Sequence, residues 1–68
     1  MLEVPWKKYS STIDICEVRT YVLKRKQLNG TTIYEVWRDG DMKFNTTRYF
    51  EFLKHAEYII RNHPGKYW

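Results

Sequence analysis

Residues 27–44 read QLNGTTIYEVWRDGDMKF, and the two turns in this stretch decide the fold. Asn29-Gly30 and Asp39-Gly40 both tolerate the positive φ that a two-residue type I′ hairpin turn requires. Residues with a high strand propensity flank each dipeptide. The stretch therefore predicts an antiparallel meander with strands at about residues 15–28, 31–38 and 41–45.

The residues that follow predict one helix at about 47–61. Six apolar residues recur at spacings of three and four and so share a face: Tyr49, Phe52, Leu53, Ala56, Ile59 and Ile60. Thr46 or Thr47 is expected to cap the helix start, and Asn62-His63-Pro64-Gly65 to end it. The predicted fold is α+β, a three-stranded β-meander packed on one C-terminal α-helix.

Outside these elements the 68 residues predict a single small domain with two short ends. Residues 1–11 are expected to be irregular, although Ser11-Thr12-Ile13-Asp14 resembles a capping box and allows a short helical turn. Residues 63–68 are expected to form a tail that either packs on Trp6 or is free. A lone Cys16 forms no internal disulfide, and we expect it to be a small buried hydrophobe.

Two-residue turns fix the register of the strands, and the register sorts the side chains into two faces. Val22 is expected opposite Trp37, Trp37 opposite Met42, and Glu35 opposite Phe44. We assign one face to the core, with Trp37 packed against Phe52 of the helix: Val18, Val22, Ile33, Trp37, Met42 and Phe44. Glu35 is the discordant residue on this face, and we expect it to pair with Lys24. The alternative is that the other face is the core, with Lys43 and Arg19 as the misfits.

The second face is then expected to be exposed and to be the binding surface. It combines cations with tyrosines and includes two cross-strand Tyr–Arg pairs, Tyr21 with Arg38 and Tyr34 with Arg25, each of which could hold a guanidinium against a ring. The predicted binding residues are Arg19, Tyr21, Arg25, Tyr34, Arg38 and Lys43.

Two classes of partner remain open, protein and nucleic acid. If the partner is a protein, this chain is an accessory or regulatory protein, of the kind that mobile elements encode. A mixed patch with an apolar centre favours a protein partner. A net charge of +4 and a basic face favour the second. The expected layout resembles the three-stranded sheet and C-terminal helix of plant AP2-type and integrase arm-binding domains, which implies DNA contact through the open sheet. The resemblance is one of topology, and no motif of those families matches.

Catalysis, metal binding and cofactor binding are not expected. His55, His63 and one cysteine provide no metal-ligand spacing, and three glycines provide no phosphate-binding loop. No nucleophile stands with a base and an orienting group, so we expect neither a catalytic residue nor a small-molecule substrate. The chain has no apolar run of the roughly 20 residues that span a membrane and begins without a signal peptide. We therefore expect a soluble, cytoplasmic protein without a membrane partner.

Overall fold

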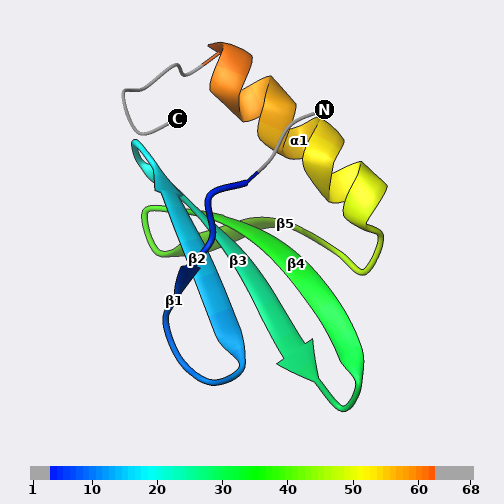
Figure 1. Ribbon diagram of the computed structural model, residues 1–68. Coiled ribbons are helices and arrows are strands. Elements are labelled where there is room, and N and C mark those ends of the chain that lie inside the picture. The colour runs from blue at the N-terminus through cyan, green and yellow to red at the C-terminus, as the bar shows by residue number, and fades with distance from the viewer. Residues whose placement is uncertain (1–3, 63–68) are drawn as a thin grey trace.

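A five-stranded antiparallel sheet and one helix form the part of the protein that the computed structural model describes, residues 4–62 (Figure 1). Each strand pairs with the next one along the chain. The strands are β1 (Lys7–Lys8), β2 (Ile13–Val18), β3 (Tyr21–Leu28), β4 (Thr31–Arg38) and β5 (Asp41–Thr46), and the helix is α1 (Tyr49–Asn62). The α+β class with a C-terminal helix is confirmed, whereas the prediction of three strands is wrong.

The extra strands come from the N-terminal third of the chain. The single strand expected at about 15–28 is two strands, because the chain reverses at residues 19–20 with Arg19 in the left-handed region at φ 56°. No Asn-Gly or Asp-Gly dipeptide marks this turn, so its local signal is weak. Residues 1–11 were expected to be irregular, yet Lys7–Lys8 pair with β2 as a short edge strand. Ile13 begins a strand, and the helical turn considered for residues 11–14 does not form.

The two hairpins of residues 27–44 form as expected. Both residues of each turn have positive φ, at 50° and 77° for Asn29 and Gly30, and at 53° and 81° for Asp39 and Gly40. The expected pairs of Val22 with Trp37 and of Trp37 with Met42 are therefore confirmed. This pairing fixes which side chains share a face.

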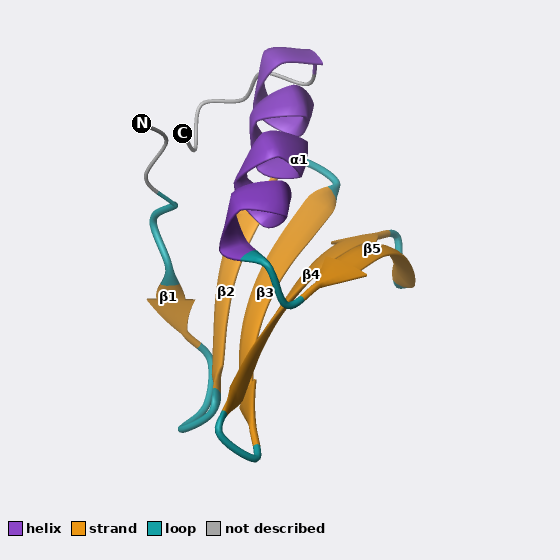
Figure 2. Ribbon diagram, turned by 90° about the vertical axis from the view of Figure 1, so that its right-hand side faces the viewer, coloured by secondary structure: helices purple, strands orange, loops and turns teal. Residues whose placement is uncertain are grey.

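The core lies on the opposite face from the one assigned from the sequence. Helix α1 packs on the side that carries Leu23 and Val36, which are 1% and 0% exposed (Figure 2). Val18 belongs to this side because the turn at residues 19–20 sets it opposite Tyr21. The assignment of Val22, Ile33, Trp37 and Met42 to the core is wrong, and the alternative left open by the sequence is the correct one.

A β-bulge in β5 accounts for the remaining error. Trp37 pairs with Met42 but Val36 pairs with Phe44, which leaves Lys43 as an extra residue between the two pairs. A bulge of this kind reverses the alternation of side chains beyond it. Phe44 therefore lies opposite Val36 on the helix side instead of opposite Glu35, where the sequence placed it.

Aromatic rings and one threonine fix the helix on the sheet. Phe52 is fully buried, and its ring centroid lies 5.7 Å from that of Trp6 and 5.0 Å from that of Tyr34. The Thr46 hydroxyl accepts the Arg48 N–H at 3.0 Å and donates to a Glu51 carboxylate oxygen at 3.1 Å, which ties β5 to the helix start. The predicted stop signal from His63 onward and the tail at 63–68 lie outside the described residues.

Candidate binding face

Four of the six predicted binding residues lie on the face that carries the helix. Tyr21, Arg25, Tyr34 and Arg38 are all half-buried there, and both tyrosines pack against the core. Their assignment to an open face is therefore wrong, and the reason is the same inversion of the core. The expected cross-strand neighbours, Tyr21 with Arg38 and Arg25 with Tyr34, are correct.

Arg25 is satisfied by partners inside the domain. Its Nη2 lies 2.7 Å from Asp14 Oδ2, its Nε donates to the same oxygen at 3.0 Å, and its guanidinium lies 4.8 Å from the centroid of the Trp6 ring. A guanidinium that is paired and stacked in this way is held in one orientation. Arg25 thus links β2, β3 and the N-terminal segment.

The two tyrosines of this face are also engaged within the fold. Tyr34 lies between Phe52 and Tyr49 with 5.0 Å between ring centroids on each side, and burial followed by the neighbouring Tyr49 raises its pKa, which Arg25 partly opposes. Arg38 lies 5.0 Å from the Tyr21 ring centroid and donates to the Tyr21 hydroxyl at 3.3 Å. The expected Tyr–Arg stack therefore forms at this pair, on the helix side of the sheet.

Arg19 and Lys43 are the two predicted residues that are exposed. Arg19 is in the turn between β2 and β3, and Lys43 is the extra residue of the bulge. Both were the misfits of the alternative core assignment. A turn and a bulge are the positions where a polar residue fits beside a buried face, which explains why neither disrupts the core.

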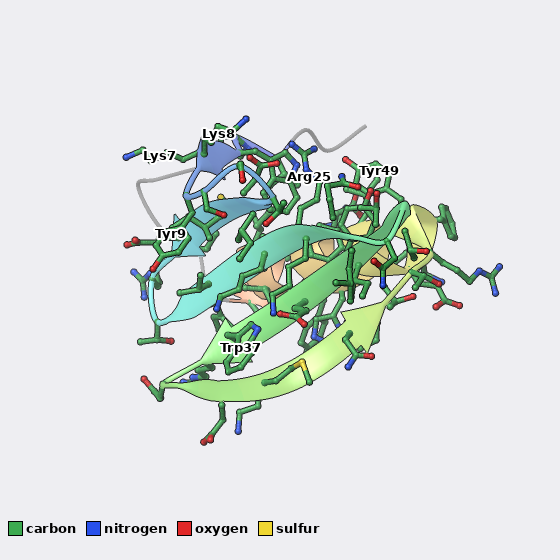
Figure 3. All side chains as sticks on the ribbon, turned by 90° about the horizontal axis from the view of Figure 1, so that it is seen from below. Lys7, Lys8, Tyr9, Arg25, Trp37 and Tyr49 are labelled. Carbon is green, nitrogen blue, oxygen red and sulfur yellow. The ribbon has the colours of Figure 1, made fainter. Side chains whose placement is uncertain are left out.

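The face of the sheet away from the helix, here called the open face, has no element packed on it in the described chain (Figure 3). Alternation along the strands places six apolar side chains on it. They are Ile13, Ile15, Val22, Ile33, Trp37 and Met42. The charged residues between them are Glu17, Lys24, Lys26 and Glu35, and Lys7 joins from β1 opposite Ile15.

These residues form rows across the strands. One row runs from Glu17 through Val22 and Trp37 to Met42. The next row runs from Lys7 through Ile15 and Lys24 to Glu35. Neighbours within a row have Cβ atoms about 5 Å apart. Val22, Trp37 and Met42 are therefore contiguous across three strands and are bordered by charged residues, whereas Ile15 lies between two lysines in its row.

Trp37 is held in place on the open face, near the C-terminal end of β4. Its Nε1 donates to Glu35 Oε1 at 2.9 Å, and the Lys24 ammonium lies 4.4 Å from its ring centroid. Glu35 is 8% exposed and lies opposite Lys24 in the register, as expected, but its ion pair is with Lys26 at 3.2 Å. The indole is a fixed, half-buried group, with one face under a cation.

A shallow hollow of about 270 Å³ opens beside this cluster, at the β1 side of the same face. It is lined by Tyr9, Ile13, Ile15, Glu17, Val22 and Lys24. Tyr9 is 70% exposed at its rim, and its N–H donates to the Ile13 carbonyl at 2.9 Å. Figure 3 shows Lys7, Lys8 and Tyr9 along this edge, with Trp37 toward the opposite side of the sheet.

Sequence reasoning missed the open face because it placed these residues in the core. One signal pointed the other way, since Glu35 does not fit a face packed against a helix. The run Lys24-Arg25-Lys26 is a second signal, because alternation sends the two lysines to one side and the arginine to the other. The lysine side is the open one.

The remaining reactive groups of residues 4–62 are isolated from one another. Cys16 is buried as expected, and burial followed by the Glu17 carboxylate raises the pKa of its thiol. His55 stacks on Phe44 at 4.4 Å between centroids, and burial lowers its pKa. Within this part of the chain no three His, Cys, Asp or Glu side chains are grouped to hold a metal ion. The described helix is too short and polar to cross a membrane.

Comparisons of the chain with protein-family models, with curated proteins and with solved structures found no match. The function is therefore inferred from the geometry of the described residues.

Proposed function

We propose that this domain is a non-catalytic protein-binding module, an accessory or regulatory protein that contacts its partner through the open face. The observation that carries the proposal is the arrangement of that face, in which contiguous apolar residues centred on Val22 and Trp37 are bordered by lysine and glutamate. An apolar centre with a polar rim is typical of protein interfaces, where tryptophan often contributes much of the binding energy.

The charges favour a protein over nucleic acid as the partner. Arg25 and Arg38 are engaged on the helix side, so the open face itself has lysines interspersed with Glu17 and the buried Glu35. Recognition of single-stranded nucleic acid uses bare aromatic faces on which bases stack. The Lys24 ammonium lies over the Trp37 indole instead. The exposed Arg19 and Lys43 would add long-range attraction for nucleic acid or for an acidic protein.

The test is capture of a partner from a lysate of cells that make the protein, with and without nuclease. We expect a discrete protein to be retained after nuclease treatment, and to be lost with Trp37→Ala or Ile15→Asp. Tyr58→Ala is the matched control, because Tyr58 is a 63% exposed aromatic residue on the helix, away from the open face. Circular dichroism confirms the fold of each variant.

Two outcomes would contradict the proposal. A yield of DNA or RNA that disappears with nuclease would support the nucleic-acid alternative. A protein partner retained by both open-face variants but lost with Tyr58→Ala would move the interface to the helix.

A further inference from the structure

The hollow at the β1 side of the open face has an uneven distribution of charge. Ile15, which helps to line it, lies between two lysines in its row, with Lys7 opposite on β1 and Lys24 opposite on β3. Glu17 is the single carboxylate among the residues that line the hollow. Lys24 therefore lines the hollow, Lys7 lies beside it on the other side of Ile15, and Glu17 is the one anion of its lining.

Neither lysine is a member of an ion pair within residues 4–62, and the Glu35 carboxylate opposite Lys24 is paired with Lys26. The ion pairs of that part of the chain join Arg25 to Asp14, Lys26 to Glu35, Arg38 to Asp39 and Arg48 to Glu51, and none includes Lys7 or Lys24. The Lys24 ammonium is instead positioned over the Trp37 ring. A cation held against a ring keeps donor hydrogens for a further acceptor and has less freedom to lose on binding.

From this geometry we infer that the partner inserts one apolar side chain into the hollow and places a neighbouring carboxylate between Lys7 and Lys24. The inference rests on the proposed protein-binding function and specifies the chemistry of the partner, an acidic segment with an aliphatic or aromatic anchor. Charge complementarity of this kind sets the register and the choice of partner more than the affinity.

The probe is a displayed library of random twelve-residue peptides, selected on the immobilised full chain. We expect the wild-type pool to be enriched in peptides with Asp or Glu within a few positions of a large apolar residue. Lys24→Gln should weaken binding of such a peptide by roughly two- to fivefold, as for an exposed ion pair. Ile15→Asp should abolish it.

A charge exchange tests the assignment independently of affinity. The double variant Lys7→Glu and Lys24→Glu should select Lys or Arg at the position where the wild type selects an acid. The matched control is Lys54→Glu, which reverses an exposed lysine on α1 and should leave the acidic preference unchanged. A glutamate at residue 24 would lie opposite Glu35 and repel it. Lys7→Glu therefore tests charge reversal without that repulsion, and Lys24→Gln tests removal of the other charge.

The outcomes separate this inference from the function on which it rests. Peptides that need Ile15 but show no acidic preference would overturn the inference and leave the open face as the binding surface. Peptides that survive both Ile15→Asp and Trp37→Ala would overturn both. Absence of any enrichment, or tighter binding of a labelled oligothymidylate than of the enriched peptides, would also overturn the inference.

Discussion

Lys24 and Arg25 are adjacent in the chain but have different roles, because successive side chains of a strand point to opposite faces. Arg25 lies on the helix side, where Asp14 and Trp6 hold it. Lys24 lies on the open side, where the Trp37 ring is its partner within the described chain. At the residue scale, the arginine therefore stabilises the fold, and the lysine is available to bind a ligand.

His55 provides a prediction about pH. Burial against Phe44 lowers its pKa, so the unfolded chain binds the proton more readily than the folded one. Stability from neutral His55 is then present above the ordinary histidine pKa of about 6.5, and is lost as the pH falls through that value and then through the lowered folded-state value. The free energy of unfolding in urea, measured from about pH 8 to about pH 5, should fall more steeply for wild type than for His55→Gln.

The comparison isolates one group, because every other titrating residue is common to both proteins. Parallel pH profiles for wild type and His55→Gln would show that His55 titrates normally in the folded state.

At the scale of elements, the bulge in β5 determines how the last strand meets the helix. Lys43 is the extra residue, and removing it would make Phe44 the next residue after Met42, which is the position that simple alternation places opposite Val36. Phe44 would therefore stay on the helix side, against the His55 ring on which it stacks. We expect deletion of Lys43 to cost less than the roughly 2 kcal/mol that exposure of a large apolar side chain would cost, measured by urea unfolding.

The control for the deletion is Lys43→Ala, which keeps the bulge and should change stability by less than about 0.5 kcal/mol, as is usual for an exposed site. Nuclear Overhauser contacts between the rings of Phe44 and His55 should persist in both Lys43→Ala and the deletion. Their loss in the deletion would mean that β5 shifts its register against β4 instead of closing the bulge.

At the scale of the whole molecule, the helix packs on one side of the sheet only. Replacing an aromatic residue by alanine should therefore lower the free energy of unfolding more on that side than on the other. Phe52 is fully buried, so Phe52→Ala should cost about 3–5 kcal/mol. Trp37 is only half-buried, and replacing it by alanine removes one hydrogen bond and one cation–π contact. Trp37→Ala should therefore cost no more than about 2 kcal/mol. Chemical denaturation measures both values.

The comparison needs no partner, because both substitutions are made in the isolated domain. A loss of 3 kcal/mol or more for Trp37→Ala, with a small loss for Phe52→Ala, would return the core to the face first assigned from the sequence.

The sequence predicted those features whose signals are local. Asn29-Gly30 and Asp39-Gly40 predicted both hairpins and the pairing of Trp37 with Val22 and Met42, because positive φ is a property of the turn residues themselves. The apolar spacing from Tyr49 to Ile60 predicted the helix. The turn at residues 19–20 and the bulge at Lys43 were missed, because neither has a residue type that requires it.

The sequence by itself therefore determined the α+β class, the central hairpins, the C-terminal helix and the burial of Cys16. Only the tertiary structure decided which face of the sheet is the core. Both faces of β3 and β4 carry apolar residues, so their alternation alone does not separate the inner face from the outer one. The turn at residues 19–20 and the bulge bring Val18 and Phe44 onto the Leu23 side, which gives that side apolar residues from four strands to pack against the helix. The position of the candidate binding face follows from that choice.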